Sequence, residues 1–367
     1  MFAEEETQTR RSKFEDKNGI LILDDYHEAA TVLSDKAFRV PDLPGFLRKL
    51  EAHAPVDLRF LKLYVDNSPF FLEGPKHKQL RDVCLRHLSG QALKEMDDVI
   101  VTQTGLILDN LPNTSFDVIA LVGKPIFTRI IKPLLGLAPL ESEKFDRLAM
   151  VLQRLIEPML SLNNLARINN ELEWLTQQIQ RQLEMGPPAG GMLAELMADK
   201  DTPLSDEEKV ALVITLYAAV APLAQTLCNI IEVLYRDGPP PSSEPLQMLE
   251  SLPYIIHQCA APRFIHRVAA QPRKLGSITI RQGDTVMIDI TKAALTEIDV
   301  PGGRLRHYSF GHGAHFCIGA PLSKRIINEF IPRFLKQFPR LQVLNKQYDE
   351  SNHIARALTS LTVSPDQ

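Results

Sequence analysis

The sequence predicts a mainly α-helical fold with small β-sheets, an α+β class, and two patterns support this prediction. Apolar residues recur every three or four positions through much of residues 74–98, 115–185 and 205–235, which is typical of helices packed against a core. After residue 262 the pattern changes to short alternating runs separated by turn residues, which is typical of strands. Helices therefore carry most of the expected core, and the strands add small sheets.

We expect one domain over residues 1–367. The length alone would allow two or three domains, and two breaks rich in Gly and Pro occur, EMGPPAGGM at 184–192 and RDGPPPSSEP at 236–245. These breaks do not separate parts of different composition, and no internal repeat is evident. A single domain is therefore the simpler prediction.

Composition and charge exclude several classes of protein. Of the 367 residues, 44% are hydrophobic and 23% are charged, which is ordinary for a globular protein with a large core. The net charge of -4 gives no basic surplus for nucleic acid. The first 19 residues are too polar for a signal peptide or anchor, and no run of 18 apolar residues occurs. We expect a cytoplasmic protein without a membrane partner.

Near the N-terminus, GILILDDYHEAATVL at 19–33 predicts a strand, a turn and a helix. Residues 74–98 predict a further helical stretch that starts beside Pro75, since proline is favoured in the first helical turn. These elements form the first part of the expected fold.

The longest predicted helix follows Leu204. Ser205 and Glu208 have the spacing of a capping box, and about thirty residues with apolar groups on all sides follow them. Such a helix is expected to be buried. Pro222 lies in its middle, removes one backbone hydrogen bond and is expected to kink or open the helix there.

The C-terminal part predicts strands on both sides of one helix. RFIHRVAA and SITIRQGDTVMIDI indicate short strands, with a hairpin-like turn at 281–284. APLSKRIINEFIPRFLKQF, after Cys317, indicates a helix, and the end of the chain from Arg340 indicates final strands.

The chain has four cysteines, too few and too far apart for a disulfide framework. Cys84, Cys228 and Cys259 are expected to be small buried hydrophobic residues. Cys317 differs, because it lies in the glycine-rich stretch YSFGHGAHFCIGAPL just before a predicted helix.

This setting favours a metal-ligating thiolate at Cys317. Free N–H groups at the start of a helix stabilise a thiolate, and Gly311, Gly313 and Gly319 would make room for a large flat ligand. The pattern suits the axial ligand of a haem iron. Two alternatives remain open, a buried structural thiol and a zinc site that includes His312 and His315, although zinc usually needs four ligands in paired spacings.

The stretch FGHGAHFCIG resembles the haem-binding signature of the cytochrome P450 family, F-G-x-G-x-H-x-C-x-G, at every specified position. The resemblance implies the cytochrome P450 fold, haem b (iron protoporphyrin IX) as cofactor and Cys317 as the ligand of its iron. It assigns cofactor-binding roles to the matching positions, which are Phe310, Gly311, Gly313, His315, Cys317 and Gly319.

The resemblance extends over most of the chain. FLEGPKHKQLRDV resembles the segment in which the family holds a haem propionate with a His and an Arg, here His77 and Arg81, which share one helix face. HRVA resembles the strand that carries a further propionate Arg, here Arg267, and His315 is implied to be another propionate contact. By themselves, His77 and Arg81 would be read as an exposed basic pair.

The long helix departs from the family pattern. The oxygen-binding motif A-G-x-[D/E]-T falls on Ala219, Val220, Ala221, Pro222 and Leu223. In the family, the acid and the alcohol deliver protons during oxygen activation, and neither Pro222 nor Leu223 can do so. Thr226, one turn later, is an alternative donor. The resemblance places the altered catalytic positions at Ala221, Pro222 and Leu223, together with Cys317.

Two further departures concern the network that supports the cysteine loop. The Glu-x-x-Arg motif falls on Tyr254 and His257, for which a Tyr–His hydrogen bond is one possible substitute. The segment before the cysteine loop is also shortened, and Arg304 or Arg306 are candidates for the Arg that completes the network. Loss of a whole buried ion pair is tolerated better than loss of half of it.

These observations predict a haem-thiolate oxidoreductase, of monooxygenase type or using peroxide, that transforms a small organic molecule in a biosynthetic pathway. The alternatives are a haem enzyme that rearranges, dehydrates or reduces its substrate, and a degenerate haem-binding scaffold without catalysis. A ferredoxin-type protein is a candidate electron donor. Four cations could face it or simply form a solvated surface: Lys324, Arg325, Arg333 and Lys336.

Overall fold

A computed structural model describes most of the chain, and the described part is mainly helical with small sheets, as predicted. Its residues form two compact units, unit 1 with residues 1–41 and 262–316 and unit 2 with residues 42–261 and 317–367. The expectation of a single domain stays a prediction. The described residues are 15–17, 20–88, 90–137, 151–152, 155, 161–186, 190–238, 245–276, 278–296 and 305–365.

Unit 1 is built on a five-stranded sheet with the order β1-β2-β8-β5-β3. Strand β2 pairs with β8 in parallel, while β5 pairs with β8 and β3 in antiparallel fashion. Helix α1 packs its buried face, with Val32 and Leu33, into the apolar cluster of this unit. The described elements are β1 (Glu15–Lys17), β2 (Ile20–Leu23), α1 (Tyr26–Ser34), β3 (Phe38–Arg39), β5 (Phe264–Ala269), β6 (Arg273–Leu275), β7 (Ile278–Ile280), β8 (Thr285–Asp289), β9 (Ala294–Thr296), β10 (Leu305–His307) and the 3-10 turn η4 (Gly313–His315).

The strand and helix expected at 19–33 are confirmed, and Asp25 caps α1 by accepting from the backbone N–H groups of His27 and Glu28. The hairpin expected at 281–284 is wrong. The chain turns there, but β7 pairs with β6, whereas β8 joins the five-stranded sheet. The turn residues were read correctly, but the partners of a strand depend on distant parts of the chain.

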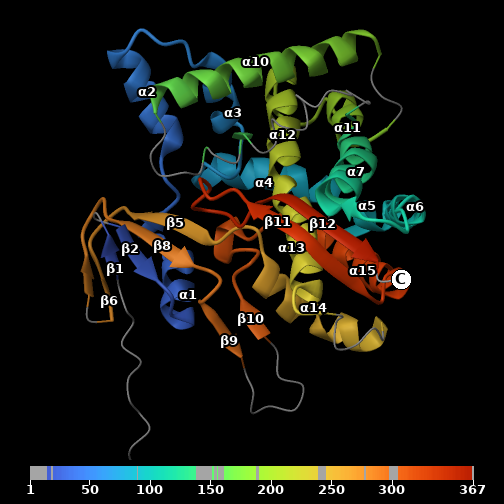
Figure 1. Ribbon diagram of the computed structural model, residues 1–367. Coiled ribbons are helices and arrows are strands. Elements are labelled where there is room, and N and C mark those ends of the chain that lie inside the picture. The colour runs from blue at the N-terminus through green and yellow to red at the C-terminus, as the bar shows by residue number, and fades with distance from the viewer. Residues whose placement is uncertain are drawn as a thin grey trace, which may run out of the picture. The chain divides into compact units, whose positions relative to one another are not determined.

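Unit 2 contains the other helices, and a C-terminal hairpin of β11 and β12 packs on them (Figure 1). The described helices are α2 (Leu43–His53), α3 (Arg59–Asp66), α4 (Gly74–Leu88), α5 (Gly90–Glu95), α6 (Asp97–Asp109), η1 (Ile119–Gly123), α7 (Lys124–Ile126), η2 (Phe127–Ile131), α8 (Lys132–Leu135), α10 (Leu162–Glu184), α11 (Met192–Ala198), α12 (Asp206–Ala219), α13 (Ala221–Tyr235), α14 (Pro245–Cys259) and α15 (Ala320–Gln337). Its described strands are β4 (Phe116–Asp117), β11 (Leu341–Tyr348) and β12 (Leu358–Pro365).

The long predicted helix is two helices, α12 and α13, which meet at Val220 (Figure 1). The predicted capping box is present, because Ser205 accepts from the N–H of Glu208 and Glu208 accepts from the N–H of Ser205. Pro222 lies in the first turn of α13, where its missing N–H costs least. The expected interruption of the helix is therefore confirmed, but the break lies at Val220, two residues before Pro222.

The combined span of α12 and α13 is long and apolar enough to cross a membrane, with a mean hydropathy of 1.9. However, 78% of its most apolar window is buried inside the protein. This is what a core helix shows, and it agrees with the prediction from the apolar pattern.

Candidate functional site

Cys317 immediately precedes α15 in unit 2, and its side chain is exposed. The other three cysteines are buried, as expected, and burial raises the pKa of each thiol to about 12. These three thiols therefore stay protonated and serve as packing groups. The exposure of Cys317 speaks against the alternative of a buried structural thiol.

Two opposing effects act on the Cys317 thiol. Burial of the sulfur raises its pKa above the ordinary value, while hydrogen bonds from the backbone N–H groups of Gly319 and Ala320 and the charge of Arg81 lower it. The raising effect is the larger. Backbone donors at a helix start are the groups that stabilise a thiolate once a metal binds it.

Helix α4 supplies the two basic residues singled out in the sequence. His77 is 6% exposed, and Arg81, one turn later, is half-buried and close enough to Cys317 to affect its pKa. The reading of an exposed basic pair is therefore wrong. Unit 2 brings Arg81 and Cys317 together, although they are far apart in the sequence.

Unit 1 contains the other predicted cofactor residues. Arg267 on β5 is 7% exposed and donates to the carbonyl of His266 at 2.8 Å. His315 is half-buried in η4, and Phe310 lies in the turn before it. The roles of Arg267, Phe310 and His315 toward a cofactor stay predictions.

The cysteine loop starts from an anchored tyrosine. Tyr308 is 2% exposed, its ring stacks on Tyr26 with 4.8 Å between centroids, and its hydroxyl donates to the Tyr26 carbonyl at 2.9 Å. The ring of His312 packs edge-on against Tyr308 at 5.7 Å. The start of the loop is thereby held on α1 within unit 1.

The three glycines of the cysteine signature differ in their backbone conformation and in their surroundings. Gly311 and Gly313 adopt left-handed φ values of 71° and 68°, and a Cβ on Gly313 would lie 2.8 Å from the Leu33 carbonyl oxygen. These two glycines are required by the loop itself. Gly319 has a φ of -83°, and a Cβ there would lie 4.0 Å from the Cys317 sulfur, so its role in making room for a flat ligand stays a prediction.

The alternative of a zinc site finds no support. Among the residues described, no group of three or more His, Cys, Asp or Glu side chains is arranged to hold a metal ion. His312 packs on Tyr308 instead. A single cysteine with flanking glycines suits haem ligation better than a four-ligand zinc site.

The helix interruption lies where the sequence places the altered oxygen-binding motif. Ala219 is exposed and Val220 half-buried, although the ten residues before Ala219 are all buried. Ala221 and Leu223 are buried, and Pro222 is half-buried. The interruption therefore coincides with a short exposed stretch in the middle of an otherwise buried helix.

Thr226, the alternative proton donor, has another partner. It is 7% exposed, and its hydroxyl oxygen accepts the backbone N–H of Ala261 at 3.0 Å. This bond joins α13 to the residues that follow α14. The contact is a structural one, and it accounts for a threonine at this position.

The Tyr–His substitute for the Glu-x-x-Arg pair does not fit the structure. Tyr254 is 54% exposed and His257 is 3% exposed, so the two side chains of α14 face different surroundings. Burial lowers the pKa of His257, which keeps it neutral. Of the two candidate arginines, Arg306 is exposed on β10, and Arg304 lies outside the described residues with the rest of 297–304.

Arg325 and Arg333, two of the four cations expected on the helix after Cys317, form ion pairs. Arg325 pairs with Asp97 at 2.6 Å and Glu329 at 2.9 Å, and Arg333 pairs with Glu329 at 3.0 Å. Burial raises the pKa of Glu329, but the hydrogen bonds from both arginines outweigh it and the net pKa is lowered. The Arg325–Asp97 pair joins α15 to α6, and the two pairs of Glu329 lie within α15. Lys324 and Lys336 lie on the exposed surface of α15.

Sequence reasoning missed one cluster in unit 2. Glu232 on α13 is fully buried and pairs with Lys346 and Arg356. A signal existed, because Glu232 is the one charged residue between Val210 and Tyr235. A lone charge in an apolar helix indicates a partner elsewhere, but the sequence does not say which.

The chain is similar to many known cytochrome P450s. No protein-family model matches it. It is 23% identical over 337 residues to pentalenolactone synthase of Streptomyces exfoliatus, and the match covers 87% of this chain and 82% of that protein. It is 24% identical to cytochrome P450 119 of Sulfolobus acidocaldarius, with 88% of each chain covered, and 26% identical to cytochrome P450 107B1 of Saccharopolyspora erythraea, with 82% and 78% covered.

Solved structures show the same fold. CalO2 superposes with a TM-score of 0.78 at 20% identity, covering 95% of this chain and 91% of that one. P450BioI, solved in complex with an acyl carrier protein that carries hexadec-9Z-enoic acid, superposes with a TM-score of 0.76 at 22% identity, covering 94% and 91%. The solved structures show that the chain has the cytochrome P450 fold. The curated relatives, together with the complete cysteine signature, support its membership of the cytochrome P450 family.

Proposed function

We propose that the protein is a haem-thiolate oxidoreductase that transforms a small organic molecule in a biosynthetic pathway. The observation that carries this proposal is the Cys317 thiol, which is accessible, lies beside the backbone N–H groups that precede and begin α15, and lies near Arg81. The relatives support an oxidoreductase, and they include pentalenolactone synthase and 6-deoxyerythronolide B hydroxylase.

The residues present fit a haem. Gly319 leaves space beside the sulfur, and Arg81 brings a positive charge near it. In the proposal Cys317 ligates the iron of haem b, and His77, Arg81, Arg267 and His315 contact the propionates. Phe310, Gly311, Gly313 and Gly319 shape the loop beside the ring. A thiolate-ligated haem supplies redox and oxygen chemistry that side chains alone cannot perform.

The chain's own side chains limit how protons are supplied. Pro222 and Leu223 have no hydroxyl or carboxyl group, so neither of these two motif positions can supply a proton. We therefore propose that the substrate's own hydroxyl or carboxyl group, or peroxide, brings the protons. Ala221, Pro222 and Leu223 then act by shape, as the apolar wall on which the substrate rests.

A ferredoxin-type protein or peroxide completes the proposed reaction, and we place the enzyme in the cytoplasm. One alternative is a haem enzyme that rearranges, dehydrates or reduces its substrate without oxygen. The other is a haem-binding scaffold without catalysis. The absence of both the acid and the alcohol at positions 222 and 223 is the observation that favours these alternatives.

The first experiment is an absorption spectrum of the purified protein, ferric and then reduced under carbon monoxide. A strongly red-shifted Soret band in the carbonyl complex is expected, and it should disappear in C317S because serine does not provide a thiolate. Turnover is then compared with peroxide and with a ferredoxin system. A protein that takes up no haem after reconstitution contradicts the proposal, and a haem protein without turnover in either system favours the scaffold.

A further inference from the structure

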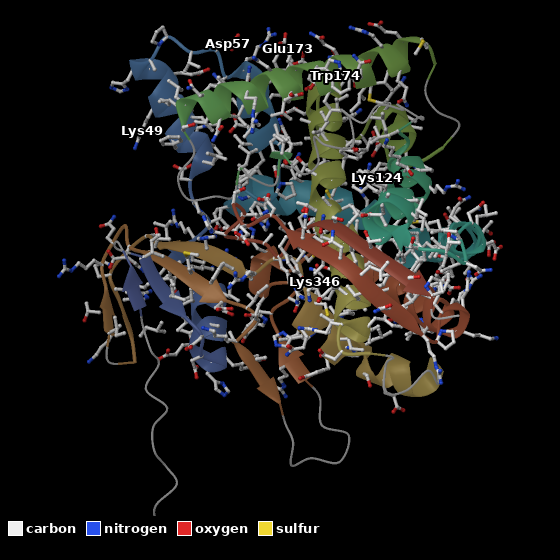
Figure 2. All side chains as sticks on the ribbon, viewed as in Figure 1. Lys49, Asp57, Lys124, Glu173, Trp174 and Lys346 are labelled. Carbon is white, nitrogen blue, oxygen red and sulfur yellow. The ribbon has the colours of Figure 1, made fainter. Side chains whose placement is uncertain are left out.

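A buried carboxylate lies between two cations in unit 2. The Glu232 side chain is 0% exposed, and its two oxygens lie 2.6 Å from Lys346 Nζ and 2.6 Å from an Arg356 Nη. Lys346 lies on β11 (Figure 2), and Arg356 precedes β12. A buried charge is retained only when it is paired, so these contacts hold the C-terminal hairpin against α13.

Arg356 is held through both its side chain and its backbone. Its guanidinium also donates to the Tyr348 hydroxyl at 2.8 Å, and it lies 5.4 Å from the centre of that ring. Its backbone N–H donates to the Ala261 carbonyl at 2.6 Å, and its own carbonyl accepts from Asn229 Nδ2 at 3.0 Å. A residue held at both ends can transmit the position of its side chain to the backbone it contacts.

The backbone it contacts is the exit of α14. Asn229 Nδ2 also donates to the Cys259 carbonyl at 3.1 Å, and Thr226 accepts the N–H of Ala261. Both backbone polar groups of Ala261 are therefore bound, one by α13 and one by Arg356. Ala261 is the last residue of unit 2 before the chain enters unit 1 at Pro262.

Helix α14 does not provide an ion pair at Tyr254 and His257 that would anchor its own end. Tyr254 is exposed, and His257 is buried and neutral, so neither side chain supplies a charge. The Glu232–Arg356 pair instead reaches the end of α14 from α13 and from the C-terminal hairpin. The end of α14 is thus held by side chains of α13 and of the C-terminal hairpin.

We propose that Glu232 and Arg356 are positioning residues that fix the exit of the chain from unit 2 at Ala261. Strand β5, which starts at Phe264, carries the proposed propionate contact Arg267. A loosened exit at Ala261 is therefore expected to weaken haem retention. This last consequence rests on the proposed function, whereas the anchoring of Ala261 does not.

Lys346 offers a matched control. It makes an ion pair of the same length with the same carboxylate, but its side chain is 41% exposed. K346M therefore removes one charge from Glu232 and leaves the bonds of Arg356 to Ala261 and Tyr348 in place. R356Q removes one charge and the guanidinium contacts together.

The test compares wild type, R356Q, E232Q and K346M by native-state amide hydrogen exchange. The amide of Leu358, two residues after Arg356, donates to Gln225 on α13 and is a second reporter beside Ala261. R356Q and E232Q are expected to speed exchange of the Ala261 and Leu358 amides about tenfold relative to the amides of α4, the order of one charge-assisted hydrogen bond. K346M should leave that ratio unchanged. Because R356Q risks failing to fold, Y348F serves as a milder variant, with a smaller change at the same amides.

Haem loss to an excess of apomyoglobin provides the second measurement, and R356Q is expected to lose haem about tenfold faster than K346M. Equal exchange ratios in R356Q and K346M overturn the anchoring. Faster exchange at Ala261 with unchanged haem loss overturns the link to the cofactor. If no variant and no wild type binds haem, the proposed function has failed, and the exchange ratios still decide whether Ala261 is anchored.

Discussion

The hydroxyl oxygen of Thr226 accepts the backbone N–H of Ala261, at 3.0 Å, and both residues are buried. This bond joins α13 to the end of α14 across 35 residues of sequence. Thr226, the alternative proton donor, therefore has a structural role.

We therefore expect T226V to lower stability. Valine keeps the shape but leaves the Ala261 N–H buried without an acceptor, which costs about 1–3 kcal/mol. T226S keeps the acceptor and is the matched control. Chemical denaturation measures the free energy of unfolding. A T226V protein with wild-type stability but without dioxygen-driven turnover would instead identify Thr226 as the proton donor.

Gly313 and Gly319 should respond differently to alanine. At Gly313 the left-handed φ and the Leu33 carbonyl at 2.8 Å both oppose a Cβ, so G313A is expected to cost about 1–3 kcal/mol of stability. At Gly319 the backbone is ordinary and the added carbon would lie 4.0 Å from the Cys317 sulfur. G319A should therefore fold with near wild-type stability and, under the proposed function, bind haem more weakly. Thermal unfolding and haem titration separate the two effects, and equal stability losses would contradict this assignment.

His266 should make the protein less stable in mild acid. Burial, and secondly the charge of Arg267, lower its pKa from 6.5 to about 4. Above pH 6.5 the imidazole is neutral in both states. As the pH falls through 6.5, the unfolded chain takes up a proton that the folded protein refuses, so stability falls until about pH 4.

Between pH 7.5 and pH 5, His266 is expected to lower the free energy of unfolding by about 2 kcal/mol. Denaturation at several pH values measures it, and H266N should flatten the slope by that amount. The remaining slope includes His257, whose pKa burial lowers in the same direction. H353N, at an exposed position, is the control. A slope that H266N leaves unchanged would show that His266 is accessible to protons in the folded protein.

Lys336 should matter more than Arg325 or Arg333 for an acidic electron donor. Both arginines are already paired with carboxylates, whereas Lys336 is exposed on α15. K336E is expected to slow reduction by an acidic ferredoxin several-fold at low salt, with the difference vanishing at high salt, because exposed charges steer association and are screened. K49E on α2 (Figure 2) is the charge-matched control. Equal effects of K336E and K49E would reduce the role of α15 to overall charge.

Much of the fold was predictable because its signals are local. The strand and helix at 19–33, the capping box at Ser205 and Glu208 and the helix after Cys317 all depend on residues a few positions apart. The turn at 281–284 was also recognised, but not the partners of its strands. A strand shows which face is apolar, yet several strands of unit 1 satisfy the same pattern.

The sequence by itself determined that Cys317 is a thiol in a glycine-rich loop before a helix. It also determined that positions 222 and 223 lack an acid and an alcohol. Both are statements about residue identity at short spacing. Tertiary structure alone decided that Arg81 acts on Cys317, that Thr226 binds Ala261 and that Glu232 pairs with Arg356. Buried polar groups must find partners within about 3 Å, and folding selects those partners from the whole chain rather than from neighbours in the sequence.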